Sequence, residues 1–265
     1  MGKIIYHYCS ANTFKLILES KKMFLSDVGT MNDTLEGEWF KNILYNEILK
    51  CGRNDINDII VSITNNLVNK YICCFSEEGD ILSQWRAYAD DGRGFSIGFD
   101  IDMMAVPNQL PVNSIYVDHT IGIFRVIYDI DIQKKMIKDG LDYIFNKDRI
   151  SGIASLARYS TIFKNPAFKE EREWRIIHTP LITYSQKDKF DFSVMSGVSE
   201  CNFRITKFGL SPYFVWDFSK LAPSLIKEIV IGPQNMTKED VLRFFLSKLG
   251  ITCVNVRRSK ASYRS

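Results

Sequence analysis

Two glutamates separated by one residue stand where a polar stretch turns apolar. The segment Glu171–Ile177 has the sequence EREWRII, and its β-branched end predicts a strand that enters the core. Side chains two residues apart on an extended chain point to the same face, so Glu171 and Glu173 are expected to project together. Either the segment is an exposed strand edge, with Arg172 and Arg175 as ion-pair partners, or the two acids are directed at a ligand.

Other polar and aromatic side chains stand at the ends of predicted elements. His7 lies in the first predicted strand, and Trp85 and Tyr88 lie three residues apart on one face of a predicted helix. A histidine, a tyrosine and a glutamate cannot form a nucleophile triad, but they can hold a nucleoside. The histidine and the carboxylate would bond ribose hydroxyls, the ring would stack on a heterocycle, and the negative charge would stabilise an oxocarbenium-like transition state. A purely structural role is the alternative for each of them.

Several common chemistries lack their sequence patterns. The three histidines are far apart and none lies in a His-Glu-x-x-His pattern, which disfavours a zinc hydrolase. No Gly-x-x-x-x-Gly-Lys-Ser/Thr loop occurs, which disfavours a P-loop ATPase. The glycine run Gly92–Gly98 precedes a strand instead of opening a helix, so it indicates a turn and not a nucleotide loop.

Composition indicates an ordinary globular protein. Of 265 residues, 46% are hydrophobic and 25% charged, and 34 basic against 31 acidic residues leave a net charge of +3. This balance argues against binding of nucleic acid or membrane by bulk charge. A local basic patch or a solvated tail remains at the C-terminus, at Arg257, Arg258, Lys260 and Arg264.

The sequence predicts a cytoplasmic protein with reduced thiols. The first residues have no apolar core of a signal peptide, and no apolar run is long enough to span a bilayer. The cysteine spacing fits neither a disulfide framework nor a zinc site; the six are Cys9, Cys51, Cys73, Cys74, Cys201 and Cys253.

The order of predicted elements is that of one α+β domain over residues 1–265, with helical insertions at about 39–70 and 131–163. Alternation of strands and helices is too irregular for a doubly wound parallel sheet. Predicted strands are 4–9, 71–76, 95–99, 124–129, 203–208, 213–216, 227–231 and 251–256, and predicted helices are 14–20, 39–50, 56–70, 80–89, 132–146, 151–163 and 238–249.

An ordered set of short motifs resembles the bacterial domain of unknown function 2971 over nearly the whole chain. The motifs are Ile5-Tyr6-His7-Tyr8, Met31-Asn32-Asp33 with Glu36, Cys74–Ser76, Trp85 with Tyr88-Ala89, Gly94 with Gly98-Phe99, Phe163-Lys164, Glu171 with Glu173-Trp174-Arg175, Ile231-Gly232-Pro233, and Ser259 with Tyr263-Arg264. Each motif alone is weakly specific, and their order carries the resemblance.

The same layout resembles the ADP-ribosyltransferase superfamily of the His-Tyr-Glu type. This resemblance implies a split, mixed or antiparallel sheet with flanking helices, NAD as the substrate, and no metal. By position, His7 would bind a ribose hydroxyl, Tyr88 would stack on nicotinamide, and Glu173 would drive transfer. Tyr6, Tyr8 and Tyr71 are rivals for the stacking role, and the further residues expected at NAD are Tyr8, Asn32, Ser76, Trp85, Glu171 and Arg175.

The resemblance further implies a bacterial toxin or phage-defence effector that modifies RNA, DNA or protein, with an antitoxin or other neutralising protein as partner and no membrane. Trp174 and Ile176 would then face the core, with the acids on the opposite face lining a cleft. Two alternatives stand beside it. One is a binding or regulatory module without enzymatic activity; the other is a metal-dependent nuclease that uses Asp33, Glu36, Glu171 and Glu173.

Overall fold

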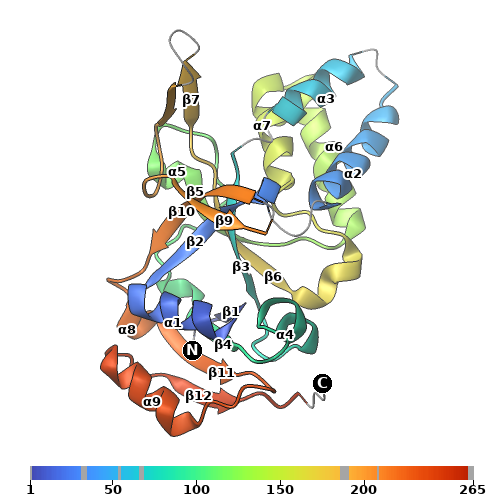
Figure 1. The fold of residues 1–265 in the computed structure, drawn as a ribbon. Coiled ribbons are helices and arrows are strands. Elements are labelled where there is room, and N and C mark those ends of the chain that lie inside the picture. The colour runs from blue at the N-terminus through green and yellow to red at the C-terminus, as the bar shows by residue number, and fades with distance from the viewer. Residues whose placement is uncertain are drawn as a thin grey trace.

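The computed structural model describes residues 2–30, 35–52, 55–65, 69–185, 191–207 and 209–261. Its main sheet contains ten strands, with the path β12-β11-β4-β1-β3-β2-β10-β9, and with β6 joined to β3 and β5 joined to β6. All neighbours are antiparallel except β11 and β12, which are parallel. The fold is therefore α+β, as predicted (Figure 1).

The strands are β1 (Ile4–Cys9), β2 (Lys22–Asp27), β3 (Tyr71–Ser76), β4 (Phe95–Asp100), β5 (Ile121–Arg125), β6 (Glu173–His178), β7 (Ile182–Ser185), β8 (Asp191–Val194), β9 (Asn202–Thr206), β10 (Gly209–Asp217), β11 (Ile226–Ile231) and β12 (Asn255–Arg258). The helices are α1 (Ala11–Ser20), α2 (Leu35–Leu49), α3 (Ile56–Asn65), α4 (Leu82–Tyr88), α5 (Val117–Thr120), α6 (Ile130–Asn146), α7 (Arg149–Tyr159), α8 (Ala222–Leu225) and α9 (Glu239–Lys248), with 3₁₀ turns η1 (Val28–Thr30), η2 (Ile101–Met103) and η3 (Pro166–Glu171).

The sheet divides between β1 and β3. Six residues of β1 pair with β4, whereas β1 meets β3 at one position, Tyr6 opposite Ser76. Beyond that point β3 pairs with β6 over its whole length, from Ser76 opposite Glu173 to Tyr71 opposite His178. Because β1 and β3 diverge from a single contact, side chains of both strands border a space between the two parts of the sheet.

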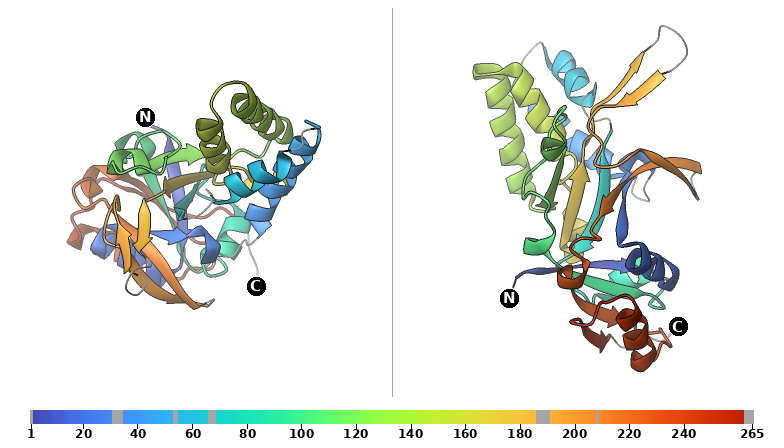
Figure 2. Two further views of the ribbon diagram at one scale, coloured as in Figure 1. Left: turned by 90° about the horizontal axis from the view of Figure 1, so that it is seen from above. Right: turned by 90° about the vertical axis from the view of Figure 1, so that its left-hand side faces the viewer.

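Four helices from the two predicted insertions, α2, α3, α6 and α7, stand together on one side of β3 and β6 (Figure 2). They enclose an apolar core of their own, which includes Phe40, Ile59, Leu141 and Leu156 and reaches Ile177 on β6. The separate core of the sheet contains Ile176, the next residue on the same strand. Strand β6 is thus buried on both faces, because consecutive side chains point to opposite sides.

Local sequence accounts for the start of two helices. Ser10 caps α1 through a hydrogen bond from the Thr13 amide to its side chain, and Asp129 caps α6 through the amides of Asp131 and Ile132. Both cap residues have the short polar side chain that satisfies free N–H groups at a helix start. No helix in the described part of the chain is long and apolar enough to cross a membrane.

Some predicted boundaries were wrong. The strand predicted at 124–129 corresponds to β5, which begins and ends earlier, at Ile121–Arg125. The strand predicted at 251–256 corresponds to β12, which begins and ends later, at Asn255–Arg258. The helix predicted at 56–70 is described as α3, which ends at Asn65, and Asn69 has the left-handed φ of 61°. The predicted strand 203–208 corresponds to β9, and Phe208 lies outside the described residues. Apolar spacing indicates where an element lies but does not mark its last turn or pair.

Candidate functional site

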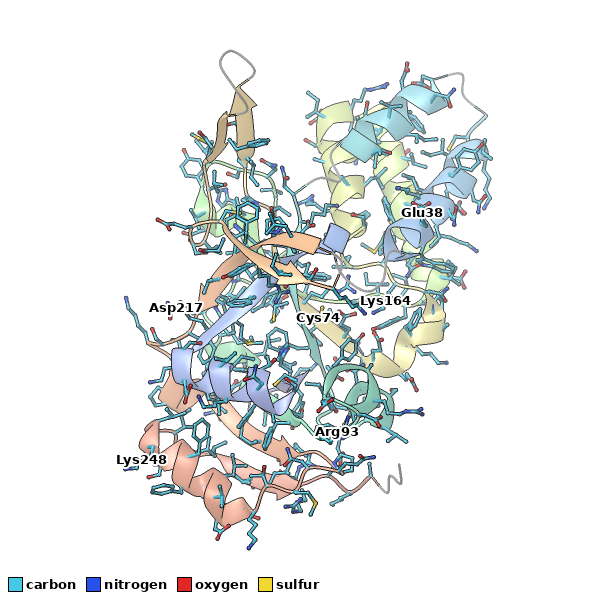
Figure 3. The ribbon with its side chains drawn as sticks, in the orientation of Figure 1. Glu38, Cys74, Arg93, Lys164, Asp217 and Lys248 are labelled. Carbon is cyan, nitrogen blue, oxygen red and sulfur yellow. The ribbon has the colours of Figure 1, made fainter. Side chains whose placement is uncertain are left out.

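A cavity of about 210 Å³ lies where β1 and β3 separate. Its apolar wall includes Ile72 and Phe75 of β3. Figure 3 labels two of its residues, Cys74 and Lys164, near the middle of the molecule where the sheet meets the helical layer. Polar side chains that are far apart in the sequence line the cavity, among them His7, Gln84, Tyr88, Lys164, Glu171, Glu173 and Arg175.

Two acids and two bases form a buried cluster on one wall. Arg175 donates to Glu173 twice, from Nε to Oε1 at 2.7 Å and from Nη2 to Oε2 at 2.9 Å. Lys164 Nζ lies 2.6 Å from Glu171 Oε2 and 3.1 Å from Glu173 Oε2. Arg175 also donates to the Thr161 carbonyl at 2.8 Å. The formal charges cancel, which is what permits four ionised groups to be buried together.

The chain brings the two acids together by a turn and not by an extended segment. Glu171 ends η3, Arg172 adopts the left-handed φ of 44°, and β6 begins at Glu173. The prediction that both acids project from one extended strand was therefore wrong. The alternative of an exposed strand edge is excluded, because β6 lies between β3 and β5. Arg172 pairs with exposed Glu78, whereas Arg175 is a partner of Glu173.

The electrostatic environment shifts the pKa values of Glu173 and Glu171 in opposite directions. Burial alone would raise the pKa of Glu173, but the charges and hydrogen bonds of Arg175 and Lys164 outweigh it and hold this pKa well below its usual range. Burial raises the pKa of Glu171, and Lys164 offsets this only in part. The ionised form of Glu173 is thus favoured, whereas Glu171 is the better proton acceptor of the two.

His7 presents an acceptor to the cavity. Its Nδ1 lies 2.9 Å from the carbonyl oxygen of Cys74, and a carbonyl can only accept, so Nδ1 carries the proton. Burial lowers the pKa of His7, which keeps the ring neutral. A neutral ring with a proton on Nδ1 has its lone pair on Nε2, and that atom can accept a hydrogen bond from a hydroxyl group.

Tyr88 stands at the end of α4 on the rim of the cavity and is 45% exposed. Burial of its hydroxyl and the nearby charge of Glu171 raise its pKa, so the hydroxyl stays protonated. The rival tyrosines are held by other contacts: Tyr6 donates to Glu228 at 3.0 Å, and Tyr71 packs edge-on against Phe214. The Tyr88 ring is thus the most accessible of the four that could stack on a ligand.

Two predicted ligand residues do not reach the cavity. The Trp85 ring is fully buried, donates from Nε1 to Asp80 at 2.7 Å and packs against Tyr8. The Ser76 hydroxyl donates to the Glu171 carbonyl at 2.7 Å and is buried. Both side chains position the walls of the site: Trp85 anchors α4, and Ser76 anchors the turn before β6.

The remaining predicted residues have different outcomes. Tyr8 lines the cavity, and its hydroxyl donates to the Glu78 carbonyl at 2.8 Å. Glu171 and Arg175 line it as described above. Asn32 lies outside the described residues.

Sequence reasoning missed three contributors. Lys164 was noted only within a motif, yet it is the cation that joins both acids. Gln84 lines the cavity four residues before Tyr88, a spacing that places both on one helix face. Tyr128 holds the start of β6, because its hydroxyl accepts the Glu173 amide at 3.2 Å. Only the helical spacing of Gln84 and Tyr88 could have been used in advance.

Among the described residues, no three His, Cys, Asp or Glu side chains gather as metal ligands would. Of the acids considered for a nuclease, Asp33 lies outside the described residues and the side chain of Glu36 is not described. Glu171 and Glu173 both contact Lys164, so an ammonium group already occupies the place between them. This arrangement does not favour the nuclease hypothesis.

Comparison with known proteins gives one match. The model of the family described as "Protein of unknown function (DUF2971)" matches residues 84–176 and supports the resemblance to that family. No curated protein and no solved structure matches the chain. The matched segment contains one side of the cavity, with Gln84, Tyr88, Lys164, Glu171, Glu173 and Arg175.

Proposed function

We propose that the protein is an NAD-consuming ADP-ribosyltransferase that acts on a macromolecular acceptor. One observation carries the proposal: His7, Tyr88 and Glu173, which lie far apart in the sequence, line one cavity at the division of the sheet. A neutral acceptor, an accessible ring and an ionised carboxylate suit the cleavage of a nicotinamide riboside, whose transition state has oxocarbenium-like charge.

In the proposed reaction, nicotinamide and its ribose enter the cavity. The ring stacks on Tyr88, and His7 Nε2 accepts a hydrogen bond from a ribose hydroxyl. The bond from ribose C1′ to the nicotinamide nitrogen breaks, and its electron pair leaves with nicotinamide. Glu173 stabilises the positive charge that develops on the ribose, because an anion fixed beforehand loses no energy to reorganisation.

A nucleophile of the acceptor then attacks C1′ and forms the new bond, while its proton passes to Glu171. The raised pKa of Glu171 suits it to accept that proton. Arg175 and Lys164 hold the two carboxylates in place. Their positive charges also reduce the repulsion between these carboxylates and the phosphates of the substrate.

The test measures nicotinamide release from NAD. We expect Glu173→Gln to abolish release and Glu171→Gln to slow transfer to the acceptor more than it slows release. Glu78→Gln is the matched control, since this acid is paired but 52% exposed at its side chain. Circular dichroism establishes that each variant is folded. Undiminished release by folded Glu173→Gln contradicts the proposal.

A labelled substrate identifies the acceptor. NAD labelled in its adenylate part is incubated with the protein and a cell lysate, and the label is followed into protein, RNA and DNA fractions. Transfer that depends on Glu173 supports the transferase. Absence of both release and transfer under these conditions contradicts it.

A second candidate is a binding or regulatory module without enzymatic activity. The observation in its favour is that Arg175 and Lys164 satisfy both oxygens of Glu173, as in a structural ion pair. This candidate predicts that NAD is not consumed. It also predicts that His7→Ala, if folded, retains full activity in any binding assay.

A further inference from the structure

Beside the cavity, two aromatic rings and a guanidinium group lie on one face of the sheet. Phe24 of β2 lines the cavity and is 42% exposed. The ring of Tyr213 on β10 lies 4.2 Å from that of Phe24, at an angle of 34°. The central carbon of the Arg204 guanidinium lies 5.5 Å from the Phe24 ring centre and 5.9 Å from that of Tyr213.

Strand register places these residues together. Ser26 lies opposite Tyr213, and Arg204 lies opposite Ser211, so alternate side chains of β2, β10 and β9 share this face. Arg204 Nη2 donates to the Ser26 hydroxyl at 2.7 Å, and Ser26 itself lines the cavity. The group formed by Phe24, Tyr213 and Arg204 therefore continues directly from the cavity wall; we call it the β2–β10 platform.

Arg204 has unused binding capacity. Its Nε is buried and has no hydrogen-bond partner within the described residues. Among the described residues, its guanidinium donates to the uncharged hydroxyl of Ser26. A buried donor without a partner costs free energy. Guanidinium groups favour phosphate oxygens because they donate in a planar fork.

A dinucleotide is larger than the cavity and would extend outside it. Its volume of about 210 Å³ is below the roughly 300–1,000 Å³ of pockets that enclose a whole drug-sized ligand. The nicotinamide riboside end of a dinucleotide can occupy it, while the other half must pass over a rim. The rim at Phe24 offers both a ring face and a cation.

We propose that the β2–β10 platform binds a nucleotide unit, with the base against Phe24 and Tyr213 and a phosphate at Arg204. The proposal rests on the proposed function, because it extends the same cavity. Stacking accepts any base, whereas the guanidinium requires the phosphate. Two sources share this chemistry: the ADP half of NAD, and a nucleotide of an acceptor strand.

Binding measurements on the full chain test the platform. The probes are NAD, ADP-ribose, nicotinamide mononucleotide, and single-stranded oligonucleotides of DNA and RNA. The variants are Phe24→Ala and Arg204→Gln. Phe203→Ala is the matched control, because this residue precedes Arg204 on β9, points to the opposite face and is 62% exposed. Thermal unfolding establishes that each variant is folded.

If the platform binds the ADP half, both variants lower the affinity for NAD and for ADP-ribose by roughly 5- to 100-fold, which is the effect of losing one base–aromatic stack. Nicotinamide mononucleotide and the control variant are unaffected. If the platform binds the acceptor, the affinity for the oligonucleotide falls by a similar factor, while the affinity for NAD is unchanged. In either case Phe24→Trp restores binding and Phe24→Leu does not, because only the former keeps a ring.

The platform proposal is overturned if Phe24→Ala and Arg204→Gln bind every probe within twofold of the wild type. Nicotinamide release, measured in parallel, separates this result from failure of the proposed function. Platform-dependent binding of ADP-ribose without NAD consumption supports the platform and contradicts the transferase. NAD consumption with unchanged KM values for NAD and acceptor in both variants supports the transferase and contradicts the platform.

Discussion

Arg175 donates two hydrogen bonds, of 2.7 and 2.9 Å, to the carboxylate of Glu173, which lies two residues earlier on the same strand. Both residues are almost fully buried. The pair explains how β6 can carry charge into the interior: each charged group is neutralised by a neighbour on its own strand, and Lys164 balances the additional acid. The stability and the chemistry of the site therefore depend on the same contact.

We predict that Arg175→Met lowers the free energy of unfolding by about 3–5 kcal/mol, because buried Glu173 loses its bidentate partner and keeps only the contact with Lys164. The double variant Glu173→Gln/Arg175→Met should lose less than the sum of the two single changes. Urea unfolding of all four proteins measures this coupling. Arg172→Met, in an exposed pair with Glu78, should cost less than about 1 kcal/mol. Additive losses would contradict a coupled pair.

Stability should fall between about pH 6.5 and 4 because of His178. Burial lowers the pKa of this histidine from 6.5 to about 4, although its bond to the Thr120 carbonyl opposes the shift. The unfolded chain takes up the proton at higher pH than the folded chain, so the contribution is complete above 6.5 and declines on acidification by about 3 kcal/mol in total.

Equilibrium unfolding measured at several pH values tests the assignment to His178. His178→Asn should flatten the slope between pH 6.5 and 4. His119→Asn, at an exposed position, should leave the slope as in the wild type. Burial lowers the pKa of His7 as well, so a smaller slope of the same sign should remain in His178→Asn. An unchanged slope in that variant would refute the prediction.

Tyr88 should act through its ring and not through its hydroxyl. Tyr88→Phe is expected to keep the KM for NAD within about twofold, and Tyr88→Ala to raise it roughly 3- to 10-fold, as for a lost aromatic contact. Steady-state nicotinamide release measures both. Tyr143→Ala, a 40% exposed tyrosine on α6, controls for loss of a surface ring. Equal KM values for Tyr88→Ala and the wild type would exclude stacking by Tyr88.

Asp80 should position α4 from outside the cavity. Its carboxylate accepts the Trp85 Nε1 at 2.7 Å and, from the C-terminal segment, the Ser259 hydroxyl at 2.5 Å and the Lys260 amide at 2.7 Å. In Figure 1 the C-terminal segment lies beside α4. Asp80→Ala leaves these donors without their acceptor and should lower the free energy of unfolding by about 1–3 kcal/mol.

Because α4 carries Gln84 and Tyr88 to the cavity, Asp80→Ala should also raise the KM for NAD. Asp80→Asn, which retains an acceptor oxygen, should recover part of both losses. Asp90→Asn removes the charge of an exposed pair with Arg93 after the same helix and keeps a residue type that tolerates the left-handed φ of this position, so no measurable change is expected from it. A normal KM in folded Asp80→Ala would show that the carboxylate only stabilises the fold.

The sequence allowed the central elements to be predicted because their signals are local. The apolar run of β3 between polar ends predicts its bounds at Tyr71–Ser76, and β1 is likewise found at Ile4–Cys9. The turn through η3 and Arg172 has no comparable signal. Contacts elsewhere in the fold hold Arg172 at its positive φ, and an arginine at this position does not indicate such a conformation. The expected extended pair of acids was wrong for that reason.

Alternation along β6 is a property of the sequence alone: any extended chain must point Glu173 and Arg175 to one face and Trp174 and Ile176 to the other. Tertiary structure decided the partners. The divergence of β1 from β3 brings His7 to the same cavity as Glu173, and the turn before β6 brings Glu171 within reach of Lys164. Spacing along a chain determines direction, whereas pairing of buried charges depends on distances across the fold and on exclusion of water.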